Sequence, residues 1–120
     1  MKHNKKAYFK RIISATKYSL KGLKSAYIYE AAFRQEVWCC FIFIPIGLIF
    51  GDNAIEKSLL VASILIVLIV ELINSAIEAV VDRIGYEINE LSGRAKDMGS
   101  SAVFVSIILA FIVWFIIFVF

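Results

Sequence analysis

Long apolar runs without any charged side chain dominate the chain from residue 37 onward. Three such runs cover residues 37–50, 58–70 and 102–120. The apolar interior of a bilayer takes roughly 20 helical residues. The last run reaches that length by itself, whereas the first two reach it only together with the polar positions beside them. The pattern predicts three membrane-spanning helices, at about residues 30–50, 58–83 and 98–120.

Residues 8–28 show a different pattern, in which apolar positions recur at helical spacing beside a row of lysines. The apolar positions are Phe9, Ile12, Ile13, Leu20, Leu23 and Tyr27. The lysines are Lys10, Lys17, Lys21 and Lys24. This pattern is typical of an amphipathic helix that lies in the membrane interface, with its amines among anionic head groups. A solvated helix on a soluble domain would look similar, but the apolar runs leave no soluble domain to hold it.

Three residues are expected to bend or interrupt these helices. Pro45 should kink the first span, and Gly85 and Gly93 should break the chain between the second and third spans. No internal repeat, low-complexity segment or linker divides the sequence. The expected fold is therefore one all-α integral-membrane domain over residues 1–120, made of a surface helix and three spans.

Positive charge is distributed unevenly along the chain. Of the 13 Lys and Arg, eight lie in residues 1–30 and three in residues 83–96, while Lys57 alone lies between the first two spans. Because cytoplasmic segments carry an excess of Lys and Arg, the N-terminus and the second connection are predicted to be cytoplasmic. This orientation explains the net charge of +3, so nucleic-acid binding is not expected. The adjacent Cys39 and Cys40 suit small apolar fillers of the first span.

The second span carries polar side chains within VELINSAIEAVVDR, residues 70–83. On a helical wheel at about 100° per residue, all of them fall within about 60° of the first glutamate. These residues, called the polar stripe below, are Glu71, Asn74, Ser75, Glu78 and Asp82. A carboxylate facing lipid is costly, so this face must lie against another helix or a cavity, and its ionisable residues are candidates for function. Asn74 and Ser75 could equally join helices through hydrogen bonds.

Position along the span separates the roles of the acidic residues. The span enters from the outer side, so Glu78 lies near the cytoplasmic surface and Glu71 lies about 10 Å deeper. Glu30, at the cytoplasmic start of the first span, can lie at the depth of Glu78. Two carboxylates at the water edge of a membrane suit Mg²⁺, which often bridges carboxylates and phosphates. Glu71 is less hydrated and suits a proton acceptor for a hydroxyl, so the set indicates phosphoryl transfer.

Two other classes of function fit parts of this pattern. An ion-coupled small membrane transporter would use Glu71 to carry protons or cations, but it would leave Glu30 and the charged second connection without a role. A non-catalytic scaffold would explain Asn74 and Ser75 as contacts between subunits, but not two glutamates. The sequence has no Walker motif, glycine-rich kinase loop or dinucleotide fingerprint, which excludes a soluble nucleotide-binding fold.

Three segments together carry a resemblance to a known family: EAAFRQE at 30–36, VELINSAIEAVVDRIG at 70–85 and ELSGRAKDMGS at 90–100. They closely resemble the small integral-membrane diacylglycerol kinases of prokaryotes. The resemblance implies phosphorylation of diacylglycerol to phosphatidic acid with ATP and Mg²⁺. It also implies a homotrimer in the bacterial inner membrane, with sites shared between subunits. One branch of the family phosphorylates undecaprenol and is the alternative, but RIGYEINELSGRAKDMGS looks more like the Gram-negative diacylglycerol branch.

The resemblance also implies roles for individual residues. Glu71 would be the general base with Asn74 beside it, while Glu30 and Glu78 would hold the metal ion. The positions that match the ATP site are Arg11, Tyr18, Glu30, Glu78, Glu87, Ile88, Asn89, Lys96 and Asp97. The positions that match the surroundings of the lipid are Arg11, Ser19, Ala32, Arg34, Glu36, Glu71 and Ser100.

Overall fold

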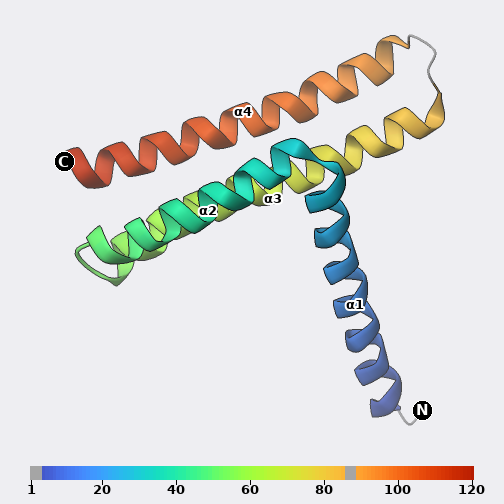
Figure 1. The fold of residues 1–120 in the computed structure, drawn as a ribbon, viewed down its shortest axis with the longest axis horizontal. Helices are drawn as coiled ribbons and strands as arrows, with labels where there is room; N and C mark the ends of the chain where they lie inside the picture. The colour runs from blue at the N-terminus through green and yellow to red at the C-terminus, as the bar shows by residue number, and fades with distance from the viewer. Residues whose placement is uncertain (1–3, 86–88) are drawn as a thin grey trace.

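The computed structural model describes residues 4–85 and 89–120, and these residues form four helices (Figure 1). The helices are α1 (Lys5–Tyr29), α2 (Ala31–Phe50), α3 (Ala54–Ile84) and α4 (Glu90–Val119). The last three run alongside one another, and α1 leaves this bundle at its junction with α2. The predicted all-helical fold class is confirmed.

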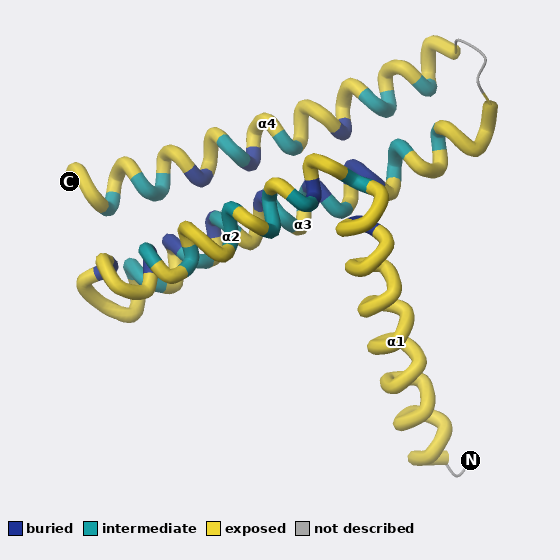
Figure 2. Tube along the Cα trace, viewed as in Figure 1, coloured by how far each residue is buried: buried dark blue, intermediate teal, exposed yellow. Residues whose placement is uncertain are grey.

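The central helix of the bundle is α3, because it packs against both α2 and α4. Its buried positions recur every three or four residues, as Figure 2 shows by the dark segments along one side of the helix. With 31 residues, α3 is about 46 Å long. The hydrocarbon core of a bilayer is only about 30 Å thick, so part of α3 must extend beyond it.

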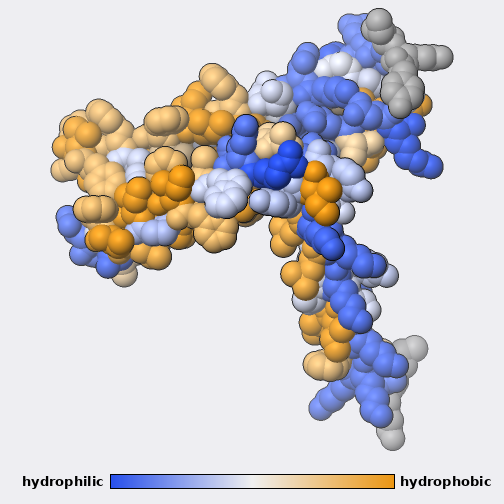
Figure 3. All heavy atoms as spheres, viewed as in Figure 1, coloured by the Kyte–Doolittle hydropathy of each residue, from blue (hydrophilic) through white to orange (hydrophobic). Residues whose placement is uncertain are grey.

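Three helices, α2, α3 and α4, are long and apolar enough to cross a membrane, counting only the part of the chain that the structure describes. This confirms the three predicted spans. Most of their large apolar side chains remain exposed in the single chain. In Figure 3 apolar residues dominate the half of the bundle that holds the C-terminus and the α2–α3 turn, although some hydrophilic atoms lie at that turn, and hydrophilic residues gather toward the opposite end, beyond the point where α1 leaves.

The junction between α1 and α2 consists of Glu30 alone. Its extended backbone, with φ −114° and ψ 106°, ends one helix and starts the next in a new direction. Arg34, on the first turn of α2, reaches back across this junction. Its Nη1 donates hydrogen bonds to the carbonyl oxygens of Tyr27 and Ile28, at 2.8 and 2.7 Å. A cation at a helix C-terminus satisfies free carbonyls and complements the helix dipole, so Arg34 stabilises the end of α1.

A tight turn joins α2 to α3. A Cβ added to Gly51 would lie 2.7 Å from Lys57 Cγ, so only glycine fits there. Asn53 Oδ1 accepts a hydrogen bond from the Glu56 N–H at 2.9 Å. This cap lets α3 begin at Ala54, earlier than the predicted residue 58. Inside α2 the helix continues through Pro45 to Phe50, and the kink at Pro45 stays a prediction.

The end of α3 agrees with the prediction. The helix ends at Ile84, directly before Gly85. Gly85 has a φ of 157°, a backbone conformation that a side chain would strain. Its predicted role as a breaker is therefore confirmed.

The predicted role of Gly93 as a second breaker is wrong. Gly93 lies inside α4, which begins at Glu90 and not near residue 98. Asn89 caps this helix, because its Oδ1 accepts hydrogen bonds from the N–H groups of Leu91 and Ser92 at 2.8 and 3.3 Å. One glycine inside a helix costs about 1 kcal/mol, and a good N-cap contributes about as much in the opposite direction. The residues predicted as a connection thus form the first turns of α4.

Candidate active site

The polar stripe of α3 begins in the interior of the bundle and ends at its hydrophilic end. Glu71, Asn74 and Ser75 expose only 5, 7 and 7% of their surface. These three therefore lie against other parts of the protein, as the cost of facing lipid predicted. Glu78 is half-buried and Asp82 is exposed, each one turn further along. The stripe thus connects a buried carboxylate to the water-facing end of the helix.

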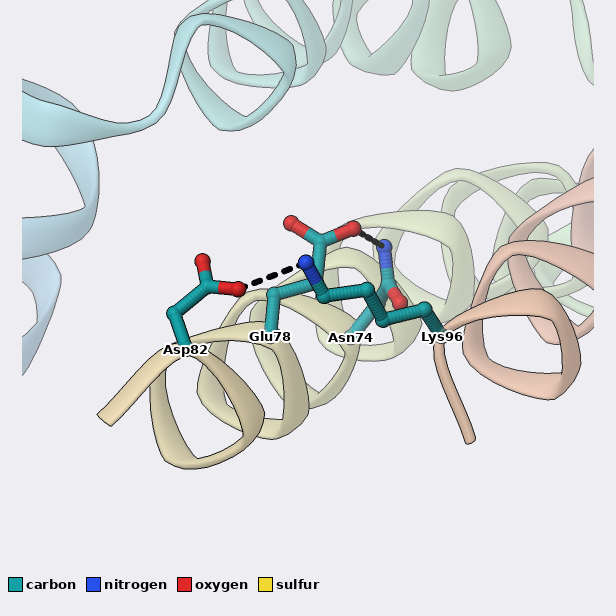
Figure 4. Close-up of polar contacts among 4 residues, drawn as sticks. All are labelled: Asn74, Glu78, Asp82 and Lys96. Atoms are coloured by element: carbon teal, nitrogen blue, oxygen red, sulfur yellow. Dashed lines mark hydrogen bonds and ion pairs between the residues drawn. The ribbon is translucent and has the colours of Figure 1, made fainter. Parts of the chain in front are cut away.

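Asn74 lies between the two glutamates of the stripe. Its Nδ2 donates a long hydrogen bond of 3.4 Å to Glu78 Oε1 (Figure 4). Its Oδ1 is buried and accepts no hydrogen bond from any residue that the structure describes. Buried polar atoms almost always have a partner in folded proteins, so this amide oxygen is an exception. The Asn74 side chain links the buried part of the stripe to Glu78 through one hydrogen bond.

Glu71 has several carboxylates in its wider surroundings. Those of Glu36, Glu78 and Glu30 lie within electrostatic range of Glu71. They come from α2, from α3 and from the α1–α2 junction, so the fold brings together residues that are far apart in sequence. Like charges at close range repel one another unless a cation or a proton intervenes. This arrangement suits chemistry in which a cation enters together with the substrate.

The acidic residues do not form a complete metal cage. Within residues 4–85 and 89–120, no three His, Cys, Asp or Glu side chains lie close enough to enclose a metal ion. A structural metal site would need more protein ligands than this. Mg²⁺ commonly takes one or two carboxylates and completes its shell with phosphate oxygens and water. The residues present therefore fit Mg²⁺ that arrives with a nucleotide.

A cavity of about 290 Å³ lies between α2, α3 and α4 next to this cluster. Its lining is apolar apart from Glu36 and Cys39 on α2, and Phe43 and Trp114 form part of its wall. The volume is just below the range of about 300 to 1,000 Å³ that is usual for ligand pockets. Glu36, predicted to lie near the lipid, thus stands between the acidic cluster and an apolar space.

At the hydrophilic end of the bundle, Lys96 on α4 forms an ion pair with Asp82 on α3 (Figure 4). The Lys96 ammonium is also within electrostatic range of Glu78. Asp82 is exposed and Lys96 is partly exposed, so water screens their attraction. Lys96 therefore lies where it can attract a phosphate to the half-buried end of the stripe.

The other residues near the start of α4 that were expected to contact the nucleotide differ in their surroundings. Asn89 uses its side-chain oxygen to cap the helix. Asp97 is exposed, one residue after Lys96. Glu87 and Ile88 lie outside the described residues.

The expected site residues on α1 are not brought to the stripe by this chain. Arg11, Tyr18 and Ser19 are exposed on α1, which packs against α2 and otherwise extends away from the bundle (Figure 1). The Ser19 hydroxyl donates to the Ala15 carbonyl at 2.9 Å. If these residues act at a site with Glu71, α1 of another copy must supply them.

The remaining expected lipid positions lie around the start of α2 and early in α4. Ala32 and Ser100 are exposed. Arg34 is half-buried, and its Nη1 is engaged by the carbonyls at the end of α1.

Two features of the bundle were not found from the sequence. Gly99 on α4 is buried against Asn74, and the signal was a glycine in a helix interior, which often marks a close approach. Trp114 donates its indole N–H to the Ser63 hydroxyl at 3.0 Å and to the Leu60 carbonyl at 3.3 Å. A tryptophan in an apolar span could have indicated this contact, because a buried indole N–H usually has a hydrogen-bond partner.

Comparison with known proteins identifies the family of the chain. The family model for prokaryotic diacylglycerol kinase matches residues 17–118. The chain belongs to this family. It is 57% identical to the diacylglycerol kinase of Escherichia coli K12 over 106 residues, which cover 88% of this chain and 87% of the relative.

Two further relatives extend the comparison. The diacylglycerol kinase of Haemophilus influenzae is 52% identical over 86% of this chain and 87% of its own. That of Pseudomonas aeruginosa is 48% identical over 88% of this chain and 85% of its own. The predicted membership of the diacylglycerol kinase family, in its Gram-negative form, is therefore confirmed. Together with the three apolar helices, it makes the chain a multi-pass bacterial membrane protein.

Proposed function

We propose that the chain phosphorylates diacylglycerol, transferring the γ-phosphate of ATP to the lipid hydroxyl to give phosphatidic acid and ADP. Family membership supports the reaction. The location of the reaction is inferred mainly from the burial of Glu71. This residue belongs to a stripe that continues through Asn74 and Glu78 to the hydrophilic end of α3. A lipid hydroxyl can reach this stripe from the apolar side while ATP stays in water.

In this proposal Glu71 acts as the general base. Its carboxylate accepts the hydroxyl proton while the lipid oxygen bonds to the γ-phosphorus and the bond to the ADP oxygen breaks. A buried carboxylate suits this role, since a positioned base within hydrogen-bond reach of the hydroxyl contributes about 100- to 10,000-fold to the rate. Asn74 holds the neighbouring Glu78 through its Nδ2.

Glu78 and Glu30 are the residues that would hold Mg²⁺ on ATP. When bound, the ion neutralises charge on the phosphates during transfer. Glu78 suits this role because it is half-buried and lies one turn from the exposed end of the stripe. Lys96 would attract the nucleotide from its position within electrostatic range of Glu78. Glu87, Ile88 and Asp97 are further nucleotide contacts by resemblance only.

The proposed orientation places the N-terminus and the α3–α4 connection in the cytoplasm. Eight of the 13 Lys and Arg lie in residues 1–30, which supports this orientation. α1 would then lie as an amphipathic helix on the cytoplasmic surface of the membrane. In Figure 3 apolar atoms gather along one edge of α1 and hydrophilic atoms along the other. Such a helix binds the interface through both edges.

We also propose that the enzyme is a homotrimer with sites shared between subunits. Among the described helices, α2 and α4 make the main contacts with α3, and many large apolar side chains of all three spans are exposed in one chain. Arg11 and Tyr18 lie on a helix that extends away from the stripe of their own chain. In a trimer, α1 of a neighbouring copy can cover the stripe and supply these residues.

A direct assay tests the reaction. Purified protein in detergent micelles is incubated with γ-labelled ATP, Mg²⁺ and diacylglycerol, and labelled phosphatidic acid is expected. A parallel tube with undecaprenol in place of diacylglycerol should give little product. Label in undecaprenyl phosphate alone would assign the chain to the other branch of the family, and label in neither lipid would contradict the proposed activity.

A further inference from the structure

Gly99 on α4 faces Asn74 on α3 at the closest approach that the glycines of this structure make. A Cβ built on Gly99 would lie 2.3 Å from Asn74 Oδ1 and 3.3 Å from Asn74 Cγ. Real Cβ atoms essentially never approach another atom to within 3.0 Å. The space that a Cβ would fill is therefore occupied by the Asn74 amide.

The Asn74 amide is held there by shape more than by hydrogen bonds. Its Oδ1 is buried without a partner among the described residues. Its Nδ2 makes one long hydrogen bond, to Glu78 Oε1. Because the clash would fall on the tip of a side chain, a Cβ at residue 99 could be accommodated if the amide rotated. Such a rotation would carry Nδ2 away from Glu78.

We propose that Gly99 is a positioning residue for phosphoryl transfer: the missing side chain at residue 99 leaves the space that holds the Asn74 amide against Glu78. The inference rests on the proposed function, because it assigns Gly99 no chemistry of its own. Gly99 sets the position of the Asn74 amide. Asn74 in turn holds Glu78, which is proposed to hold Mg²⁺. A structural glycine that only lets α3 and α4 approach would not depend on the side chain at residue 74.

The same helix supplies a matched control. Gly93 also lies inside α4, but a Cβ added there would meet nothing within 4 Å. The changes Gly99→Ala and Gly93→Ala therefore add the same methyl group to the same helix and raise its intrinsic helix propensity equally. Only the first one reaches Asn74.

The experiment combines these variants with Asn74→Ala in a double-mutant cycle, measuring phosphorylation of diacylglycerol and its dependence on Mg²⁺ concentration. We expect Gly99→Ala to lower kcat by about 100-fold, the size of effect that a misplacement of about 1 Å can have. The Mg²⁺ concentration that gives half-maximal activity should rise as well, because Glu78 loses its partner. Gly93→Ala should behave as the unmodified protein.

The decisive comparison is made in the Asn74→Ala background. There the added methyl group meets no amide, so Gly99→Ala should lower activity no further. If the two effects multiply instead, Gly99 acts independently of Asn74 and the inference is overturned. Equal activity of Gly99→Ala and the unmodified protein would overturn it too.

Folding is followed in the same samples by circular dichroism and gel filtration. If Gly99→Ala alone fails to fold but the double variant folds with the activity of Asn74→Ala, the methyl group conflicts with Asn74 as proposed. If the double variant also fails to fold, Gly99 is a general packing residue and the inference is overturned. Absence of activity in the unmodified protein would contradict the proposed function itself, and the inference with it.

Discussion

Trp114 on α4 donates its indole N–H to the Ser63 hydroxyl on α3, with 3.0 Å between Nε1 and Oγ. The same N–H also points to the Leu60 carbonyl at 3.3 Å, and the indole packs edge-on against Phe43 of α2, with ring centroids 5.6 Å apart. One side chain therefore ties all three spans together, in the half of the bundle away from the polar stripe.

Replacing Trp114 by Phe should weaken this connection. The change keeps an aromatic ring but removes the N–H donor, and a hydrogen bond between membrane helices is worth about 1 kcal/mol. We expect a loss of about that size in the free energy of unfolding, measured in mixed micelles with increasing sodium dodecyl sulfate. Trp38→Phe is the control, because Trp38 is 60% exposed. Equal stability of the two variants would argue against the connection.

Glu71→Gln should abolish most of the turnover while preserving the fold. The amide cannot accept the hydroxyl proton as a carboxylate does, so kcat should fall by about 100- to 10,000-fold with little change in the KM for ATP. Steady-state kinetics and circular dichroism measure the two effects. Glu56→Gln makes the same change at the other end of α3, where Glu56 caps the α2–α3 turn, and should leave kcat unchanged. A fully active Glu71→Gln enzyme would remove Glu71 as the base.

Removal of divalent ions should stop the reaction but leave the protein folded. The described residues offer no three-ligand metal cage, so no structural metal is expected to support the helices. Excess EDTA should therefore eliminate activity with no change in the thermal unfolding midpoint, and added Mg²⁺ should restore turnover. Glu78→Gln should raise the Mg²⁺ concentration needed for half-maximal activity. A drop of the unfolding midpoint in EDTA would point to a structural metal instead.

Lys96 is expected to exchange Asp82 for a phosphate when ATP binds. Lys96→Met should raise the KM for ATP, because it removes the cation, whereas Asp82→Asn should lower it, because it frees the cation. Asp82 is exposed and Lys96 is partly exposed, so unfolding measurements should show little effect of either change. Identical KM values in both variants would exclude Lys96 from nucleotide binding.

Arg34→Met should loosen the end of α1. The Tyr27 and Ile28 carbonyls lose their charged donor, so the last turn of α1 should fray. Hydrogen exchange followed by mass spectrometry should show faster exchange over that turn, and Arg34→Lys should show an intermediate rate. Lys21→Met, an exposed change on α1, is the control. Unchanged exchange in Arg34→Met would mean that the cap does not hold the junction in solution.

The length of the uncharged apolar runs was enough to predict the spans, and helical periodicity was enough to predict the polar stripe. The burial of Glu71, Asn74 and Ser75 follows from the high cost of exposing them to lipid, which depends on the sequence alone. The start of α4 was not predictable in the same way. There the helix forms with its cap at Asn89 despite the glycine at residue 93. The favourable free energy of the cap and the unfavourable one of the glycine are of similar size.

Contacts between helices could not be predicted from the sequence, for a different reason. Whether Gly99 meets Asn74, or Arg34 meets the end of α1, depends on how two helices are rotated and how one backbone torsion is set. Residues on α1 such as Arg11 illustrate the limit most clearly. In the proposed trimer, their relation to Glu71 would depend on a neighbouring copy of the chain.

Because Glu30 alone separates α1 from α2, the junction between these helices has no further linker residues that could absorb a movement. Any rocking of α1 must be absorbed by the backbone torsions of this one residue, and those torsions also aim its carboxylate. If α1 rests on the bilayer as proposed, a change in membrane curvature that tilts it would also shift a proposed metal ligand. The rate of lipid phosphorylation would then respond to the mechanical state of the membrane that supplies the lipid.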